Sequence, residues 1–361
     1  MDTLANFRDR IAAAQAGAKP LRLRGAGTKD FYGEVLFGDV LDTRPHRGIV
    51  SYEPSELVVT ARCGTPLSEV ESALAAERQF LAFEPPRFGA DPTIGGVVAA
   101  GLSGPRRASA GAVRDFVLGA SLLGAGGEEL HFGGQVMKNV AGFDVSRLLC
   151  GSLGFLGLIT QVSLKVMPLP RAELTLQLDC DARDALARFD QWRALPLPIS
   201  AACWQAGALR VRLSGARSAV RAACAVIGGA SIADAEAADG WQALRDQSQP
   251  FFGRAVDETR SLWRLSLPAT APFDLGLAAP APDDLLIEWA GALRWLYCAA
   301  AAEPIRTAAA KAGGTAMRWC GPRDGPMFHP LAPATLALHR RLKQAFDPLA
   351  LFNRGRLLEA A

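Results

Sequence analysis

The stretch LRLRGAGTKDFYG, residues 21–33, predicts a short strand followed by a glycine-rich loop. The alternating run LRLR is typical of a short strand, and the glycines of GAG end it abruptly. Neighbouring glycines let backbone N–H groups converge on an anion, and Arg24, Thr28 and Lys29 place donors beside them. A plain glycine-rich turn explains the same letters, so this stretch alone leaves both interpretations open.

Two common nucleotide-binding loops do not fit this stretch. A dinucleotide-binding turn needs a glycine three positions after Gly27, and Asp30 occupies that place. A P-loop needs Gly-Lys-Ser/Thr after four intervening residues, whereas here the order is Thr28-Lys29 and the first glycine lies too close. The sequence therefore supports neither a nicotinamide-dependent dehydrogenase nor an NTPase.

Two further glycine clusters favour a ligand over a plain turn. They are DPTIGGVVAAGLSGPRRASAGAVRD (91–115) and GSLGFLGLIT (151–160). We expect 91–115 to form a long apolar loop whose backbone lies against a large planar or extended ligand. Three separated clusters favour a long ligand with a pyrophosphate in the middle and a ring at one end.

Composition narrows the class of protein. A length of 361 residues predicts two domains or lobes, and 50% hydrophobic with 21% charged residues is typical of a globular chain. The net charge of +3 gives no reason to expect nucleic acid as a partner. No apolar run reaches the roughly 20 residues of a membrane span, and charges interrupt the place of a signal peptide. We therefore expect a cytoplasmic chain without a transmembrane segment.

The seven cysteines are scattered and form no CxxC pair. Because local metal and iron–sulfur sites need closely spaced ligands, we expect no metal in this chain and buried thiols in a reducing compartment.

The periodicity of the chain predicts an α+β fold. In the first part we expect a strand over 57–64, a helix over 66–79, two strands within 115–133, and a strand within 144–168. After residue 168 strands and helices alternate as in an α+β sheet with helices on one face. A tail helix over 333–346 ends at Asp347-Pro348, and an extended segment follows it.

Five blocks, in this order, resemble the FAD-binding domain of the vanillyl-alcohol oxidase and p-cresol methylhydroxylase (PCMH) superfamily. RGAGT is similar to the pyrophosphate loop of that family, and DPTIGG, SGPRRASAGAVRDFVLGA and GSLGFLGLIT are similar to its later glycine segments. FDPLALFNRGRL resembles its C-terminal motif, with Arg354 in place of the usual proline. TKDFYG and GGQVMKNVAGFDVSRLLCGSLGFLG are most similar to the E-subunit family of bacterial glycolate oxidases.

The resemblance implies a fold and a domain division. It implies a two-lobed PCMH-type FAD-binding domain over 1–168 and a smaller ferredoxin-like α+β cap domain over 169–325. A C-terminal segment, 326–361, would return to the FAD domain.

The resemblance also implies a non-covalently bound FAD and its contacts. Residues 24–29 would hold the pyrophosphate, 93–96 would pass beside the ribityl chain and flavin, and Asn353 would approach the ring. No histidine lies between residues 1 and 42, which closes one route to covalent attachment, and Cys63 and Cys150 are expected to be buried thiols. The full set of predicted cofactor-binding residues is Arg24, Gly25, Ala26, Gly27, Thr28, Lys29, Thr93, Ile94, Gly95, Gly96, Ser103, Gly104, Arg107, Gly111, Val113, Asp115, Lys138, Asn139, Gly154, Ile159 and Asn353.

The activity implied is oxidation of glycolate, a 2-hydroxy acid, to glyoxylate in a complex with a catalytic flavoprotein D subunit and an iron–sulfur F subunit. Attachment to the inner membrane would then run through those partners. No catalytic residue is assigned: His329 is the best candidate for a base, and Arg318 and Arg323 could hold a carboxylate. We expect His46, His131 and His339 to be surface residues. A stand-alone flavin-dependent dehydrogenase of the D-lactate type and a non-catalytic structural subunit stay open as alternatives.

Overall fold

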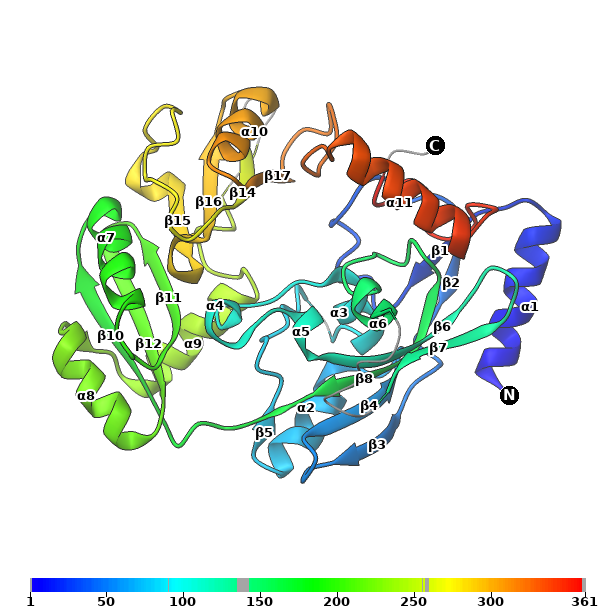
Figure 1. Cartoon of the computed structure of the whole chain (residues 1–361), viewed down its shortest axis with the longest axis horizontal. Coiled ribbons are helices and arrows are strands. Elements are labelled where there is room, and N and C mark those ends of the chain that lie inside the picture. Colours follow the sequence, from blue (N-terminus) through cyan, green and yellow to red (C-terminus); the bar gives the residue numbers. More distant parts are fainter. Residues whose placement is uncertain (1, 90, 135–142, 255, 257–259, 359–361) are drawn as a thin grey trace. The chain divides into compact units, whose positions relative to one another are not determined.

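The computed structural model describes residues 2–89, 91–134, 143–254, 256 and 260–358. Contacts between Cα atoms group the chain into two compact units, whose elements are labelled in Figure 1. The first unit takes Met1–Ser103, Gly111–Leu169 and Pro330–Ala361, and the second takes Gly104–Ala110 and Pro170–His329. The division into an FAD domain, a cap and a return segment at 168 and 325 stays a prediction.

The first unit is built on an antiparallel sheet with strand order β3-β4-β8-β6-β7. All seven residues of the strand VLGASLL are buried, because this central strand is covered on both faces. A sharp glycine turn joins it to the next strand, as the sequence predicted. The strands are β3 (Ile49–Glu53), β4 (Val58–Arg62), β6 (Val117–Leu123), β7 (Glu129–Gly133) and β8 (Leu158–Lys165).

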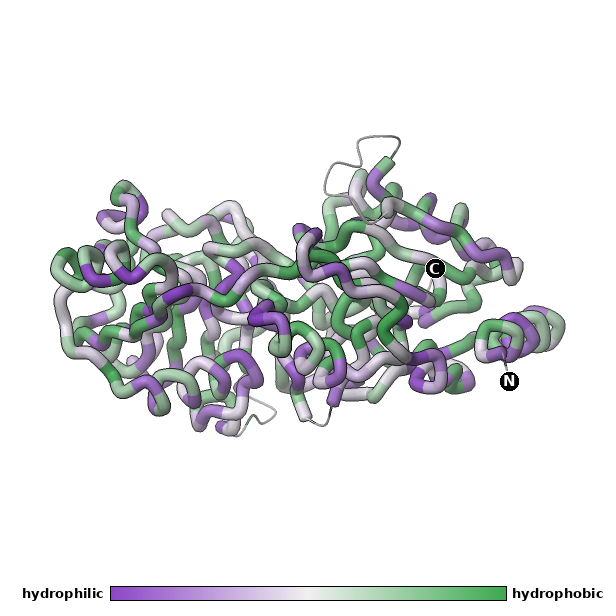
Figure 2. Tube along the Cα trace, turned by 90° about the horizontal axis from the view of Figure 1, so that it is seen from below, coloured by the Kyte–Doolittle hydropathy of each residue, from purple (hydrophilic) through white to green (hydrophobic). Residues whose placement is uncertain are grey.

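Outside this sheet, β1 (Leu21–Arg24) pairs in parallel with β2 (Asp39–Asp42), and the N-terminal helix α1 (Thr3–Ala16) belongs to the same core cluster. Asp2 caps α1 by accepting a hydrogen bond from the backbone of Leu4. Hydrophobic and hydrophilic residues alternate along this helix, beside the N label in Figure 2. Its apolar side buries Phe7 and Ile11.

The expectation of a continuous loop over 91–115 is wrong. The segment contains three short helices: α3 (Ile94–Ala100), α4 (Arg107–Ala110) and α5 (Val113–Phe116). Thr93 caps α3 by accepting a hydrogen bond from Gly96 N, and Gly101 ends it in the left-handed conformation. The apolar run between these caps is buried, so its hydrophobic residues serve the core.

The remaining elements of the first unit are short or peripheral. The strands β5 and β9 form a separate two-stranded ladder, and the C-terminal segment follows α11. These elements are α2 (Leu67–Ala76), β5 (Gln79–Phe80), α6 (Val145–Leu148), β9 (Met167–Pro168) and α11 (Pro333–Phe346).

The second unit has an antiparallel sheet with strand order β13-β10-β12-β11-β15-β16-β14-β17. Helices α7 and α8 pack on the leucine-rich face of its first half, and α10 on the matching face of its second half. The elements are β10 (Ala172–Asp179), α7 (Ala182–Arg193), β11 (Ile199–Gln205), β12 (Ala208–Gly215), α8 (Arg217–Ile227), β13 (Ala230–Ser231), α9 (Asp234–Arg245), β14 (Ser261–Ser266), η1 (Pro282–Asp284), β15 (Leu285–Glu288), η2 (Trp289–Gly291), β16 (Leu293–Cys298), α10 (Ala302–Lys311) and β17 (Thr315–Cys320).

This sheet is an internal duplication. β10, α7, β11, β12, α8 and β13 form a β-α-β-β-α-β unit whose strands lie in the order fourth, first, third, second, which is the ferredoxin-like arrangement. β14, β15, β16, α10 and β17 repeat that order, and the segment between β14 and β15 replaces the first helix. Pairing of β11 with β15 joins the repeats into one sheet. The predicted ferredoxin-like α+β fold is thereby confirmed.

The described helices include none that is both long enough and apolar enough to cross a membrane.

Candidate functional site

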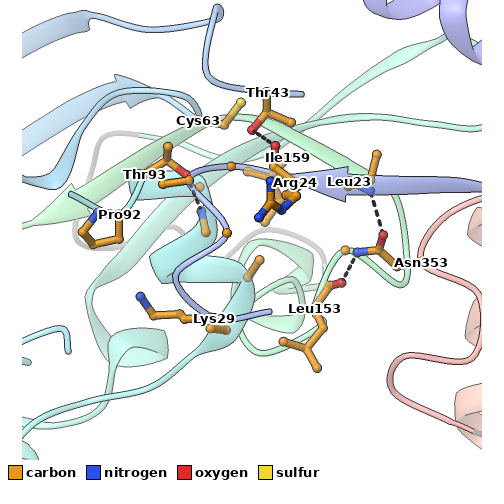
Figure 3. Close-up of a pocket in the computed structure, with 18 of the residues that line it drawn as sticks. Leu23, Arg24, Lys29, Thr43, Cys63, Pro92, Thr93, Leu153, Ile159 and Asn353 are labelled. Atoms are coloured by element: carbon orange, nitrogen blue, oxygen red, sulfur yellow. Dashed lines mark hydrogen bonds between the residues drawn. The ribbon is translucent and has the colours of Figure 1, made fainter. Parts of the chain in front are cut away.

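The first unit contains a pocket at the carboxyl end of β1, shown in Figure 3. The empty space between its lining atoms, part of it open to solvent, is about 720 Å³. Its lining comes from all three glycine clusters and from the C-terminal segment. The lining residues are Leu23, Arg24, Gly25, Ala26, Gly27, Thr28, Lys29, Asp30, Thr43, Cys63, Pro92, Thr93, Gly95, Gly96, Ala99, Ala100, Leu153, Gly154, Gly157, Leu158, Ile159, Asn353 and Arg356.

Glycines in the first loop keep its backbone bare where it faces the pocket. A Cβ on Gly25 would lie 2.2 Å from the Thr93 hydroxyl, which is far inside van der Waals contact. Gly27 has φ +75°, and a Cβ there would lie 2.2 Å from a guanidinium nitrogen of Arg24. Larger residues at either place would displace neighbours that line the pocket, so the loop sequence is explained by close approach.

The second wall begins where α3 begins. Thr93 faces the loop at Gly25 and caps the helix by accepting a hydrogen bond from Gly96 N at 3.3 Å. A Cβ on Gly95 would lie 2.6 Å from Cβ of Cys63, so the start of the helix packs directly on the chain after β4. Gly95 and Gly96 thus contribute backbone to this wall of the pocket.

Asn353 ties the C-terminal segment to the other two walls, as Figure 3 shows. Its side-chain oxygen accepts a hydrogen bond from Leu23 N at 2.7 Å, and its amide nitrogen donates to Leu153 O at 2.5 Å. A Cβ on Gly154 would lie 2.6 Å from that same amide nitrogen. The side-chain oxygen and nitrogen of Asn353 are thus both bonded to backbone, so this residue holds the walls together.

Charged side chains around the loop bond to one another and to its backbone. The carboxylate of Asp30 accepts from Arg22 at 2.5 Å and from Nε of Arg24 at 2.7 Å. Arg356, which is buried, donates to Lys29 O at 2.7 Å and to Tyr32 O at 2.8 Å. These contacts fix both ends of the loop, and the net local charge stays positive, as an anion site requires.

Sequence reasoning missed Asp30 and Arg356 as residues of this site. Asp30 stands inside the quoted stretch, six and eight positions after Arg24 and Arg22, and a lone acid in this basic loop was the available signal. Arg356 lies 327 positions from Lys29, and only the folded chain brings them together.

The expectation of buried cysteines is correct for Cys63 and Cys203 and wrong for Cys320, which is exposed. Burial raises the pKa of Cys63, which lines the pocket, to about 12 from its ordinary value of 9.0. Burial likewise raises the pKa of Cys150 to about 12. Since the thiolate is the nucleophile, neither sulfur is prepared for covalent attachment at neutral pH.

Several predicted cofactor residues lie away from this pocket. Ile94 is buried in the core, and Ser103 accepts a hydrogen bond from Val113 N at 3.1 Å. The carboxylate of Asp115 accepts from Ala112 N at 2.8 Å, and a Cβ on Gly111 would lie 3.0 Å from it.

Two other predicted residues, Gly104 and Arg107, belong to the second unit, where both contact Trp289. Lys138 and Asn139 lie outside the described residues. The roles of these residues stay predictions.

The candidate catalytic residues have structural contacts. Nδ1 of His329 accepts from Ala316 N at 3.3 Å, and desolvation, with the nearby charge of Arg306, lowers its pKa. Arg318 pairs with Asp324, and the role suggested for Arg323 stays a prediction. The expectation that His46 is a surface residue is wrong: it is buried and its ring bonds to Thr3 Oγ1 at 2.7 Å.

Comparisons with known proteins agree with this site. Residues 2–133 match the family described as FAD binding domain. Glycolate oxidase subunit GlcE of Escherichia coli (strain K12) is 45% identical over 350 residues, which cover 97% of this chain and 95% of that protein. The chain belongs to the GlcE family.

Other relatives share part of the chain or its fold. Glycolate oxidase subunit GlcD of Bacillus subtilis (strain 168) is 30% identical over 171 residues, which cover 47% of this chain and 36% of that protein. A solved structure of alkyldihydroxyacetonephosphate synthase has a TM-score of 0.66 at 14% identity and covers 97% of this chain and 75% of its own. At that identity the match concerns the fold, and it confirms the expected α+β architecture.

The family assignment confirms FAD as the cofactor and an FAD-dependent oxidoreductase subunit as the class of protein. The pocket fits such a ligand, because glycines of all three clusters line it and positive side chains stand beside the first loop. A Cβ at residue 25, 27, 95 or 154 would collide with neighbouring protein atoms, so these glycines let the walls pack into this shape. The assignment of individual residues to FAD remains a proposal.

Proposed function

We propose that this chain is the FAD-binding E subunit of a glycolate-oxidising complex, with a catalytic flavoprotein and an iron–sulfur protein as partners. The observation that carries the proposal is the glycine-rich pocket of the first unit in a chain 45% identical to a glycolate oxidase subunit. The relatives GlcE and GlcD carry names of subunits, which supports a complex of several chains.

The residues of the pocket have separate tasks in this proposal. Backbone N–H groups of residues 25–29 would hold the pyrophosphate, and the Lys29 and Arg24 cations would balance its charge. Thr93, Gly95 and Gly96 would lie along the sugar-alcohol chain, and Gly154 with Ile159 would close the opposite side.

The chemistry that bound FAD would supply is the uptake of a hydride and the transfer of its electrons to a metal centre. The chain itself contributes binding, orientation and exclusion of water. Among the described residues no group of three or more His, Cys, Asp and Glu side chains could hold a metal, so electrons leaving this chain would go to a metal in a partner.

In this proposal FAD is bound non-covalently and can dissociate. Cys63 lies in the pocket wall, but its thiol stays protonated until the pH approaches about 12. A protonated, desolvated thiol is a poor nucleophile toward a flavin. Binding of FAD would then depend only on non-covalent contacts with the pocket.

The experiment adds glycolate anaerobically to the FAD-loaded chain and follows the visible absorbance of oxidised flavin. We expect little bleaching by the chain alone and rapid bleaching once the partner subunits are added. D-lactate is tested in parallel. Bleaching of the isolated chain by either acid would favour the stand-alone dehydrogenase, and a chain that takes up no FAD would leave a structural role.

A further inference from the structure

The second unit contains a second pocket, formed by residues that the FAD site does not use. It lies between α9 and the face of the first ferredoxin-like repeat that is opposite α7 and α8; α9 is labelled beside β10 and β12 in Figure 1. It encloses about 760 Å³ of empty space, part of it open to solvent. The lining residues are Thr175, Cys203, Gln205, Ala206, Ala208, Arg210, Ile232, Ala237, Gly240, Trp241, Leu244 and Gln249.

Strand register explains why this face is polar. Gln177, Arg210 and Cys203 lie opposite one another on β10, β12 and β11, and Thr175 lies opposite Arg212. Residues directly opposite share a face, while their neighbours point to the leucine core under α7 and α8. The open face therefore presents a guanidinium, amides and a thiol to the space under α9.

Arg210 is the charged residue among the described residues that line this pocket. Its Nε donates to the Gln177 side chain at 3.1 Å, which orients the guanidinium, and Glu236 lies 3.9 Å away at the exposed rim. A Cβ on Gly240 would lie 3.2 Å from Nη1 of Arg210. Glycine inside a helix costs about 1 kcal/mol relative to alanine, and here it leaves room for this cation.

Gln249 supplies a donor that has no acceptor within the described part of the chain. Its side-chain nitrogen is buried, and among the described residues it has no hydrogen-bond partner. A buried donor left unpaired costs about 1–3 kcal/mol, so an acceptor inside the pocket would restore that loss.

The apolar walls are flat and fixed. The indole N–H of Trp241 donates to Thr175 Oγ1 at 2.9 Å, and the guanidinium carbon of Arg212 lies 5.0 Å from the ring centroid. Leu244, Ile232 and Ala237 extend the apolar surface beside this ring. An aromatic wall held in one orientation favours a planar ligand.

Cys203 gives the pocket no reactivity at neutral pH. The thiol is fully buried, and desolvation, with the nearby carboxylate of Glu288, raises its pKa well above the ordinary value. Since a thiol in that state does not attack a ligand, the lining is suited to binding.

We propose that this pocket binds a small aromatic carboxylate, with the carboxylate on Arg210, the ring along Trp241 and a ring substituent accepting from Gln249. Guanidinium and carboxylate form a planar, bidentate pair, which matches a pocket with one cation beside an aromatic wall. This site goes beyond the proposed oxidation of glycolate and does not depend on it.

The test uses salicylate as the probe, titrated into the FAD-loaded full chain by isothermal calorimetry, with benzamide as the neutral planar comparison. We expect saturable salicylate binding and binding of benzamide at least about tenfold weaker, because the charge-assisted pair is lost. Equal affinities would overturn the role of Arg210, and absence of saturable binding would overturn the site.

Two matched variants on one helix show where the probe binds. Ala237→Leu fills the pocket, whereas Ala238→Leu, next to it, is exposed and outside the lining. We expect the first to weaken salicylate binding at least about tenfold and the second to leave it unchanged. Arg210→Gln should abolish the preference for salicylate over benzamide, and equal behaviour of the two alanine variants would refute this location.

Discussion

At the residue scale, the site depends on glycines at positions where no side chain would fit. Gly25 and Gly95 allow chains to pack at distances that a Cβ would forbid, and Gly27 also has a positive φ. The contacts that surround them, Thr93, Cys63 and Arg24, come from different elements. A substitution at one of these glycines therefore displaces residues that line the pocket.

Gly27→Val is expected to abolish retention of FAD while the fold persists. The new side chain would meet the guanidinium of Arg24 and fill the loop, whereas Gly127 has a similar φ of +82° and open space around it. Gly127→Val is thus a control that carries the same backbone strain, of about 1–2 kcal/mol, away from the pocket. Flavin absorbance per protein and far-ultraviolet circular dichroism check both variants. Equal flavin content in the two would contradict the loop assignment.

Because of Cys63, the free energy of unfolding is expected to fall at alkaline pH. Its pKa is about 12 when folded and ordinarily 9.0, so the unfolded chain loses its proton first, and stability falls as the pH rises from 9 toward 12. At about pH 10.5 this thiol alone removes about 2 kcal/mol.

Urea unfolding at about pH 8 and about pH 10.5 measures this loss, which should be smaller in Cys63→Ala than in the natural chain. Cys320→Ala, at an exposed cysteine, is the control and should behave like the natural chain. An unchanged loss in Cys63→Ala would show that the thiol is ionised or solvated in the folded state.

At the scale of elements, the C-terminal return segment is held by one buried ion pair. Lys343, near the end of α11, bonds to Asp347 at 2.6 Å and also to Phe155 O and Phe352 O. The Asp347 carboxylate accepts in addition from the backbone of Leu351 and Phe352. Desolvation lowers the pKa of Lys343 against the opposing effect of Asp347. This network aligns the segment that delivers Asn353 to the pocket.

Lys343→Met is expected to destabilise the chain by about 3 kcal/mol, because it leaves a fully buried carboxylate without its cation. Arg341→Met, at an exposed position of the same helix, should change the free energy of unfolding by less than about 0.5 kcal/mol. Denaturant midpoints of the two variants measure the difference. Equal midpoints would mean that the network is open to water.

At the scale of the whole molecule, the two units have different designs. The first gathers backbone from distant parts of the chain around one pocket, while the second is a repeated β-α-β-β-α-β fold in a continuous sheet. Gly104–Ala110 is grouped with the second unit because Arg106 pairs with Glu173 at 2.7 Å and Ser109 donates to Ser200 O at 2.8 Å.

Purification of the tagged chain with its partners is expected to yield more flavin than this chain alone can hold, together with iron. The described residues offer no metal-holding cluster, so iron would report an iron–sulfur partner. Flavin and iron assays per tagged chain give the counts. Dissociation by high salt should return this chain with flavin and without iron, and a complex with neither extra flavin nor iron would contradict the proposed partners.

Local sequence determined the elements whose pattern is strong. LRLR followed by GAG forms β1 and a loop, and strands and helices follow one another in the second unit as the sequence predicted. The helices α1 and α9 were missed, because each buries few residues and their apolar spacing is weak. The strand β14 was missed although most of its residues are buried, because its sequence SLWRLS has no clean alternation. The α3 helix was mistaken for a loop because its two glycines outweighed the cap at Thr93.

The amino-acid sequence by itself determined the family, the cofactor and the three glycine clusters, because these reside in contiguous letters. Only the tertiary structure decided which of those residues share a pocket, that Asn353 braces its walls and that Arg356 reaches the loop. The physical reason is that hydrogen bonds between residues hundreds of positions apart depend on packing of the whole unit, which leaves no periodic signal in a local stretch of sequence.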